Sequence, residues 1–297
     1  MLLFVMRMIL VANPRSGRGD GHSVVEVLRA RLEAAGHQCE VRRTDPTMNG
    51  TVIARETAGN ADVLVVLGGD GSLFEVVNGI METPHRPRLA QIPVGTGNSF
   101  IKDLGINTVE DGLAAILGGK VRAVDLGRFT STSGTYYFIN LLGAGFVARV
   151  ARLAGRFRFL GAFSYTLAVL LLLVPLKARR LEIVADGVTS VRDALFVEVC
   201  NSRKTGGDMI IAPDAEVDDG LFNIIIAKAM NRRQVLALFP QIFKGTHVHS
   251  PLVESFTCRS ISARFDTIEP VSPDGEQTGG TPLTAEIVPK ALELYSL

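Results

Sequence analysis

The sequence predicts a two-lobed protein, with an N-terminal α/β lobe built on a doubly wound, mostly parallel sheet and a C-terminal lobe rich in β-strands. Short apolar runs alternate with helical patterns over the first 120 residues, as in βαβ units. After Lys120, strand-like segments dominate, and turn signals such as Asp186-Gly187 and Asp219-Gly220 separate several of them. A length of 297 residues also suits two closely joined lobes.

The first lobe should contain four strands that alternate with helices. Strands are predicted at 8–12, 39–43, 63–67 and 89–93, and helices at 24–35, 52–58 and 73–80. In parallel sheets of this kind, ligands bind beyond the carboxyl ends of the strands. The loops that follow the strands are therefore where a site is expected.

The second lobe should consist mainly of strands. They are predicted at 121–129, 135–142, 180–185, 194–200, 221–227, 260–264 and 283–288. One helical insertion is expected at 146–175. We expect the first lobe to span 1–124, completed by the C-terminal segment near 284–297, and the second lobe to span 125–283.

The composition is that of a globular protein with ample material for a core. Apolar residues make up 47% of the chain and charged residues 21%, and a net charge of +1 gives no nucleic-acid-binding footprint. The three cysteines are far apart and odd in number, which favours a reduced, cytoplasmic protein over a disulfide scaffold. Arg7 interrupts the apolar N-terminus and no cleavage site follows, so a first strand is a better interpretation than a signal peptide.

Three predicted strand exits carry glycine-rich turns. Their candidate phosphate-binding residues are Asn13, Pro14, Ser16 and Gly17 in the first turn, Gly68, Gly69, Asp70, Gly71, Ser72 and the following Glu75 in the second, and Gly95, Thr96 and Asn98 in the third. Glycine lets backbone N–H groups approach a phosphate closely, and the helix after the second turn adds its positive end. One such turn is weak evidence, but three on one sheet edge indicate a phosphate site. The chain has no Walker lysine pattern and no G-x-G-x-x-G after the first strand.

The three turns occur in this order, and Asp274-Gly275-Glu276 follows late in the chain. This set of motifs resembles that of the diacylglycerol kinase catalytic family, which includes bacterial lipid kinases and sphingosine kinases. The matches span nearly the whole chain. The resemblance implies an α/β nucleotide lobe joined to a β-sandwich lobe, an NAD kinase/diacylglycerol kinase-like fold with ATP in the cleft. It also implies an ATP- and Mg²⁺-dependent lipid kinase, with diacylglycerol as the first candidate acceptor.

Two positions depart from the family pattern. Ser72 stands where the family commonly has Thr, and the hydroxyl is retained. Ser99 stands where the family commonly has Asp, so an acidic group near the phosphates is lost. The second departure weakens the case for diacylglycerol itself as the acceptor.

The resemblance implies roles for several acidic residues. Glu276 would be the general base that takes the proton from the lipid hydroxyl, and Asp70 would help to hold the Mg²⁺ that bridges the ATP phosphates. Asp125 matches a further acidic position of the family. By position, the ligands of a second metal segment would be Glu216, Asp219 and the carbonyl of Leu221, and oxygen ligands in a turn suit a hard cation. The stretch around Glu276 and the second metal segment are also compatible with ordinary surface turns, and Asp125 with a charged residue on a strand edge.

Further contacts are suggested by position alone. Thr44, at the exit of the second predicted strand, is a candidate nucleotide contact together with Thr96. Arg15 and Arg18 could meet a phosphate or a lipid headgroup, although loop arginines are more often merely solvated.

The acceptor side is suggested by residues 147–180, which carry basic residues and no acidic one. The basic residues bracket the apolar run 159–176, whose length touches the lower limit for a membrane span. Gly161, Ser164 and Pro175 dilute the run. A buried or interfacial helix beside a basic patch is the better interpretation, and it predicts a peripheral membrane protein that meets its lipid at the surface.

Two alternatives stay open. Gly-Gly-Asp-Gly loops also occur in soluble-substrate kinases of the NAD kinase type, and a non-catalytic lipid-binding regulator could keep the same fold. The sequence does not decide which lipid is the acceptor or whether the protein forms a homo-oligomer. The leading hypothesis is a cytoplasmic, peripherally membrane-associated kinase with ATP and a lipid alcohol as partners and no nucleic acid.

Overall fold

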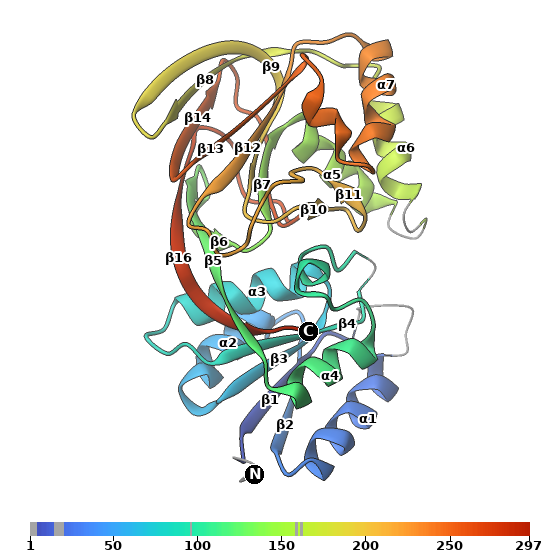
Figure 1. Ribbon diagram of the computed structural model, residues 1–297, viewed down its shortest axis with the longest axis vertical. Helices are drawn as coiled ribbons and strands as arrows, with labels where there is room; N and C mark the ends of the chain where they lie inside the picture. Colours follow the sequence, from blue (N-terminus) through green and yellow to red (C-terminus); the bar gives the residue numbers. More distant parts are fainter. Residues whose placement is uncertain (1–4, 15–20, 96, 158–159, 161–162) are drawn as a thin grey trace. The chain divides into compact units, whose positions relative to one another are not determined.

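The computed structural model describes residues 5–14, 21–95, 97–157, 160 and 163–297 (Figure 1). The chain folds into two compact units, one made of residues 1–124 and 290–297 and the other of residues 125–289. The first unit is an α/β unit with a mostly parallel sheet, and the second is a β-sandwich. The predicted fold class is confirmed.

The sheet of the first unit is parallel. Its strands are β1 (Arg7–Ala12), β2 (Gln38–Arg43), β3 (Val63–Gly68) and β4 (Arg88–Pro93), in the order β4-β3-β1-β2. The end of strand β16 (Leu283–Tyr295) lies beside β4, where Leu294 pairs with Leu89. Every residue of β3 is buried, as expected for a central strand that is covered on both faces.

Helices cover both faces of this sheet, with α1 and α4 on one face and α2 and α3 on the other (Figure 1). The helical segments are α1 (Gly21–Ala34), α2 (Gly50–Thr57), η1 (Ala58–Asn60), α3 (Asp70–Met81), η2 (Phe100–Leu104) and α4 (Val109–Gly118). The sequence analysis did not predict η2 or α4. The start of α4 carries a local signal, because Thr108 and Asp111 form a reciprocal capping box.

The second unit is built from antiparallel strands. They are β5 (Val121–Ser131), β6 (Gly134–Phe138), β7 (Leu141–Gly145), β8 (Arg179–Ala185), β9 (Val188–Cys200), β10 (Lys204–Thr205), β11 (Met209–Ile210), β12 (Phe222–Lys228), β13 (Val253–Cys258), β14 (Ser260–Phe265), β15 (Val271–Pro273) and β16. One layer contains β15, β7, β9, β12 and β13, and the other contains β9, β8, β14, β16, β5 and β6. The long strand β9 belongs to both layers. Its first half pairs with β8, and its second half lies between β7 and β12.

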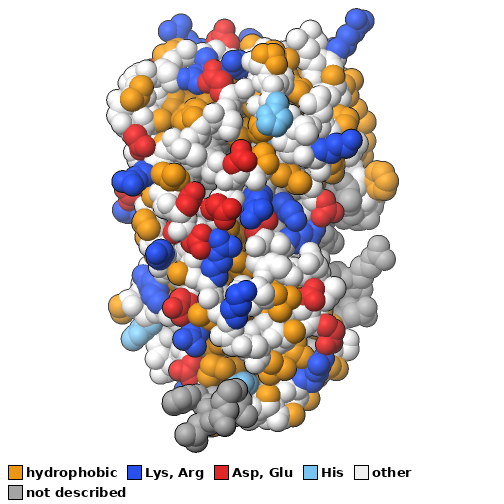
Figure 2. Space-filling view, in the orientation of Figure 1, with side chains coloured by type: hydrophobic (Ala, Val, Ile, Leu, Met, Phe, Trp, Pro, Cys, Tyr) orange, Lys and Arg blue, Asp and Glu red, His pale blue; other side chains and the backbone are white. Residues whose placement is uncertain are grey.

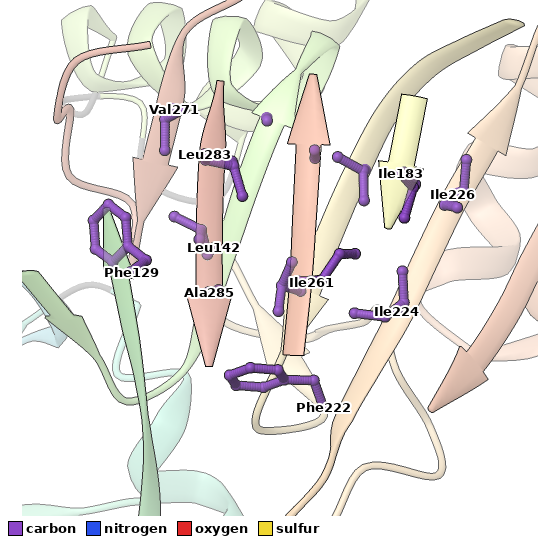
Figure 3. Close-up of a cluster of buried hydrophobic side chains, with 14 of the residues drawn as sticks. Phe129, Leu142, Ile183, Phe222, Ile224, Ile226, Ile261, Val271, Leu283 and Ala285 are labelled. Carbon is purple, nitrogen blue, oxygen red and sulfur yellow. The ribbon is translucent and has the colours of Figure 1, made fainter. Parts of the chain in front are cut away.

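The core of the second unit lies between the two layers. Figure 3 shows Phe129, Leu142, Ile183, Ile224 and Leu283 from five strands pointing into one apolar cluster. The opposite face of the β7–β9–β12 layer is covered by helices α5 (Phe146–Arg156), α6 (Phe163–Leu172), α7 (Arg232–Ile242) and η4 (Thr246–His249). Within the described ranges, no helix is both long enough and apolar enough to cross a membrane.

Three predicted elements differ from the structure. The single strand predicted at 135–142 is wrong, because the chain breaks into β6 and β7 where Asp274 binds the amides of residues 139–141. The described residues of the helical insertion predicted at 146–175 form α5 and α6 as separate helices, and α7 was not predicted at all. The last strand extends beyond residue 288 and gives its final residues to the first unit.

Helices α2 and α3 pack closely because Gly79 has no side chain. An added Cβ at Gly79 would lie 2.2 Å from the carbonyl oxygen of Thr51 and 2.8 Å from the Cβ of Ala54. The nearest atom belongs to the backbone, so a small rotation of a side chain could not relieve the clash.

We expect Gly79→Ala to lower the free energy of unfolding by about 1–3 kcal/mol, because it forces the two helices apart. Urea denaturation followed by circular dichroism would measure the change. Gly118→Ala is the matched control, since an added Cβ there meets no atom within 4 Å, and its stability should be unchanged or slightly higher. Equal stability of the two variants would contradict the close packing described here.

Candidate active site

The second and third glycine turns of the first unit touch each other through their backbones. A Cβ added to Gly95 would lie 2.5 Å from the Cα of Gly69 and 2.8 Å from its nitrogen. Gly69 is also the N-cap residue of α3 and, as a glycine, has no side chain with which to cap the helix. The first amides of α3, which include those of Gly71 and Ser72, therefore stay available to an anion at a positive helix end.

Asp70 ties the third turn to the start of α3. Its Oδ1 accepts a hydrogen bond of 2.8 Å from the Ser99 amide and a longer one of 3.4 Å from the Phe100 amide, at the start of η2. Burial raises the pKa of the Asp70 carboxyl, and these backbone hydrogen bonds oppose the rise. Asp70 thus holds the loop in place, and a metal ion would have to share a carboxylate that already serves the backbone.

The first turn lies at the same sheet edge. The Asn13 amide donates to the Leu67 carbonyl at 3.3 Å, and Asn13 Nδ2 lies 3.4 Å from Ser72 Oγ. Pro14 follows and is exposed. Ser16, Gly17 and Thr96, as well as Arg15 and Arg18, lie outside the described residues.

Asn98 has a backbone conformation that favours a turn, with φ of +50°. Its side-chain nitrogen donates to the Gly95 carbonyl at 2.8 Å. Its Oδ1 is buried and has no hydrogen-bond partner among the residues that the structure describes. A buried acceptor of this kind beside the glycine turns is suited to a donor group on a ligand.

Two further candidates of this unit have clear structural contacts. Glu75 accepts a hydrogen bond of 2.8 Å from the Gly50 amide and so holds the start of α2. Thr44 continues the β1–β2 pairing, since its amide donates to the Ala12 carbonyl at 2.9 Å. Neither contact involves a glycine turn.

In the second unit, Asp274 anchors the turn that carries Glu276. Its carboxylate accepts three backbone hydrogen bonds of 2.9–3.0 Å, from Ile139, Asn140 and Leu141. Asp274 has a φ of +47° and is 6% exposed, whereas Glu276 is exposed at the surface. The turn is therefore fixed from inside, while Glu276 lies at its exposed side.

Asp125 is completely buried and belongs to the same framework. Its Oδ2 accepts a hydrogen bond of 2.7 Å from the Gly220 amide, and its carbonyl accepts one of 2.9 Å from Asn201 Nδ2. Asn201 Nδ2 also donates to the Ile139 carbonyl at 2.7 Å, beside the amides that Asp274 binds. Any contribution of Asp125 to a reaction would therefore act through the position of these loops.

The predicted metal segment is a loop with concentrated negative charge. Burial and then the neighbouring charges of Asp125, Glu216 and Asp218 raise the pKa of Asp219, whose Oδ1 also accepts a hydrogen bond from the Leu221 amide. Among the described residues, no three His, Cys, Asp or Glu side chains are grouped closely enough to hold a metal ion. The oxygen donors suit a hard cation that keeps water ligands, as Mg²⁺ does.

The second unit also contains a deep apolar pocket of about 1020 Å³, its opening to solvent included. Apolar side chains from β7, β9, α5, α6 and α7 form most of its wall, among them Leu141, Phe146, Val169, Phe196 and Phe239. Gly275 also lines it, immediately before Glu276. The pocket therefore reaches the turn that carries the proposed base.

Glu198 and Ser272 are polar residues of this pocket that were not predicted from the sequence. Glu198 is 4% exposed, and burial raises the pKa of its carboxyl to about 8. Its signal in the sequence is a single acidic residue inside the otherwise apolar stretch Ala194–Cys200. No local pattern distinguishes Ser272, because its place in the pocket depends on how β15 pairs with β7.

Comparisons with known proteins cover nearly the whole chain. The diacylglycerol kinase catalytic domain matches residues 7–129, and the YegS C-terminal NAD kinase beta sandwich-like domain matches residues 140–296. A diacylglycerol kinase of Staphylococcus saprophyticus is 31% identical over 277 residues, which cover 92% of this chain and 90% of the relative. A diacylglycerol kinase of Staphylococcus aureus (strain MRSA252) is 32% identical, with coverage of 92% and 87%.

Solved structures agree on the fold. A diacylglycerol kinase from Bacillus anthracis str. Sterne superposes with a TM-score of 0.77 at 22% identity and covers 100% of this chain and 98% of its own. A candidate diacylglycerol kinase from the same strain superposes with a TM-score of 0.83 at 24% identity and covers 98% of both chains. The resemblance stated from the motifs is confirmed: the chain belongs to the diacylglycerol kinase family, whose members are phosphotransferases with an alcohol group as acceptor.

Proposed function

We propose that this protein is an ATP- and Mg²⁺-dependent lipid kinase that transfers the γ-phosphoryl group of ATP to the hydroxyl of diacylglycerol or a closely related lipid alcohol. The observation that supports this most is the apolar pocket whose wall includes Gly275, directly before Glu276. An acyl chain gains from burial in such a pocket, whereas a nucleotide or a sugar phosphate would leave its walls without apolar contacts.

The first unit is assigned to ATP. The start of α3 at Gly69 and the bare backbones of Gly69 and Gly95 suit phosphate oxygens. Asn98 Oδ1, which has no partner among the described residues, can accept a hydrogen bond from the nucleotide. We assign Asn13, Ser72 and Thr44 as further contacts at the same edge of the sheet. Phosphoryl transfer depends mainly on how the reacting groups are positioned and how their charge is stabilised. Backbone N–H donors that are already in place before ATP binds suit this reaction.

The second unit is assigned to the lipid and the base. Glu276 is an exposed residue, and its carboxylate can accept the proton of the attacking hydroxyl. The backbone hydrogen bonds of Asp274 keep the turn from moving, which is the property that an aligned base requires.

Mg²⁺ is assigned to carboxylate and carbonyl oxygens. Asp70 is the candidate ligand near the phosphates, and Glu216, Asp219 and the Leu221 carbonyl are candidates in the acidic loop. When bound, Mg²⁺ would neutralise part of the phosphate charge.

The helical layer of the second unit is assigned to a membrane surface. Figure 2 shows hydrophobic side chains over α6 and α7, and Phe163, Leu171, Val174 and Phe243 are exposed there by 76%, 48%, 70% and 47%. The exposed basic residues of these helices and of α5 are Arg152, Arg156, Arg232 and Arg233. Apolar groups flanked by positive charge favour an anionic lipid surface.

The proposed function predicts that the purified protein makes a phosphorylated lipid from labelled ATP and diacylglycerol vesicles, and that Glu276→Gln lowers kcat by about 10²–10⁴-fold because the general base is lost. Thin-layer separation of the labelled products would measure both. Glu286→Gln is the control, since Glu286 pairs with Arg128 on the surface and should leave kcat unchanged. Turnover of NAD or a sugar phosphate without lipid product would establish a soluble-substrate kinase, and nucleotide binding without any transfer would favour a regulator.

The assignment of ATP to the glycine turns predicts that Gly95→Ala weakens ATP binding by more than about tenfold. The added methyl group pushes residue 95 away from Gly69, so the backbone amides of the two turns no longer point toward one phosphate position. Isothermal titration calorimetry would measure the dissociation constant. Gly118→Ala serves again as the control, and an unchanged ATP affinity in Gly95→Ala would remove these turns from the nucleotide site.

The assignment of the helical layer predicts that Leu171→Asp lowers the fraction of protein bound to anionic vesicles by about fivefold, because a charged group replaces apolar surface. Vesicle sedimentation would measure the bound fraction. Val188→Asp is the control, since Val188 is 70% exposed at the β8–β9 hairpin, outside this layer. Turnover of a short-chain diacylglycerol dispersed in water should be unchanged in both variants, and equal vesicle binding by both would rule out this surface.

A further inference from the structure

Three polar side chains inside the apolar pocket have no role in the proposed transfer of phosphate. Glu198 of β9 is 4% exposed, Ser272 of β15 3% and His247 of η4 3%, and all three line the pocket. Glu198 Oε2 and Ser272 Oγ have no hydrogen-bond partner in the part of the chain that the structure describes. Unpaired polar atoms cost free energy in an apolar setting, so together they point to a ligand with a polar group.

Glu198 and Ser272 belong to one row across the sheet, with Gly143 between them. Gly143 pairs with Ser272 on one side and with Glu198 on the other. Residues that are paired across neighbouring strands project from the same face, so the two side chains flank a position without a side chain. Glu198 Oε1 lies 3.5 Å from where a Cβ of residue 143 would be, so the carboxyl reaches over the bare glycine.

The polar groups of the pocket are uncharged at neutral pH. Burial raises the pKa of the Glu198 carboxyl to about 8, so the protonated form, which can donate a hydrogen bond, predominates. Burial also lowers the pKa of His247, against a smaller opposing effect of the Ile211 backbone, so its imidazole is neutral. The described residues that line the pocket include no Lys, Arg or Asp. A neutral polar group therefore suits the pocket better than an ammonium or a carboxylate.

We propose that Glu198 and Ser272 form a specificity subsite that binds an acyl ester of the acceptor lipid. An ester carbonyl oxygen accepts two hydrogen bonds and donates none, so it can satisfy the carboxyl and the hydroxyl together. The inference rests on the proposed function, because it takes the acceptor to be a lipid. It narrows that acceptor to a neutral acylglycerol and excludes a sphingoid base, whose ammonium group would find no negative charge here.

The position of the subsite along the chain agrees with this chemistry. Ser272 begins the short segment that leads to Glu276, and Gly275 lines the same pocket. In a diacylglycerol, an ester is attached to the carbon next to the one that bears the free hydroxyl. A subsite for the ester should therefore be close to the base that acts on the hydroxyl, as it is in this segment.

The test compares dioctanoylglycerol with 1,2-di-O-octylglycerol, a diether that has the same chains and hydroxyl but no carbonyl groups. Both are presented in the same mixed micelles, and kcat/KM is measured for each. The wild-type protein should prefer the diester by about tenfold, the effect of one or two hydrogen bonds. Glu198→Leu should lower kcat/KM for the diester to within about twofold of the diether and leave the diether rate unchanged.

Glu198→Gln keeps a donor of the same shape and should retain most of the preference. Ser272→Ala should lose a part of it. Ser255→Ala is the control for Ser272→Ala, because Ser255 is exposed at the far end of the same row and does not line the pocket. Thermal unfolding of each variant would show that it is folded.

Equal kcat/KM for diester and diether in the wild type, or an undiminished preference in Glu198→Leu, overturns the subsite while the lipid kinase activity stands. A higher kcat/KM for a sphingoid base than for the diester also overturns it. If the wild type phosphorylates none of these lipids, the proposed function fails, and this inference fails with it.

Discussion

The backbone contact between Gly69 and Gly95 is the constraint on which the first unit depends. The two residues follow neighbouring strands, and their separation leaves no space for a side chain on Gly95. Asp70 holds the third turn in place, because its carboxylate accepts hydrogen bonds from the backbone amides at the start of η2. Backbone donors can thus converge at one edge of the sheet without a lysine loop, and their direction is fixed by strand pairing. An anion site built from the main chain in this way needs little reorganisation when the ligand arrives.

Several carboxylates for which the motifs suggest a role in catalysis or metal binding serve here largely to hold the backbone in place. Asp70, Asp125 and Asp274 each accept hydrogen bonds from amides of a separate loop. A charged acceptor forms stronger hydrogen bonds than a neutral one, so a short side chain can hold a loop that has no secondary structure of its own. Of the acidic residues in the glycine and Asp-Gly-Glu motifs, Glu276 is the one that the structure leaves exposed on a fixed turn.

The sequence was most informative where local patterns dominate. The strands of the first unit and its second and third glycine turns follow from apolar runs and glycines, which act within a few residues. The break at residues 139–140 could not be predicted, because it depends on Asp274, more than 130 residues further along the chain. The pocket was missed for the same reason, since its wall is assembled from strands and helices that meet only in the folded unit. Glu198 can be recognised in the sequence as an isolated acidic residue in an apolar strand. Ser272, with which it forms the proposed subsite, is brought near it only by the register of the strands.

Strand β16 is shared between the two units. Its residues up to 289 belong to the sandwich and the remainder to the α/β unit, where Leu294 pairs with β4. The α/β unit is therefore made of two separate stretches of the chain, residues 1–124 and 290–297, whereas the sandwich is one continuous stretch. A fragment that stops at residue 124 would expose the apolar edge of β4, which invites association between copies. Exchange of an entire α/β unit between relatives would have to carry the codons for residues 290–297 along with those for residues 1–124, so these two segments are expected to be inherited as a pair.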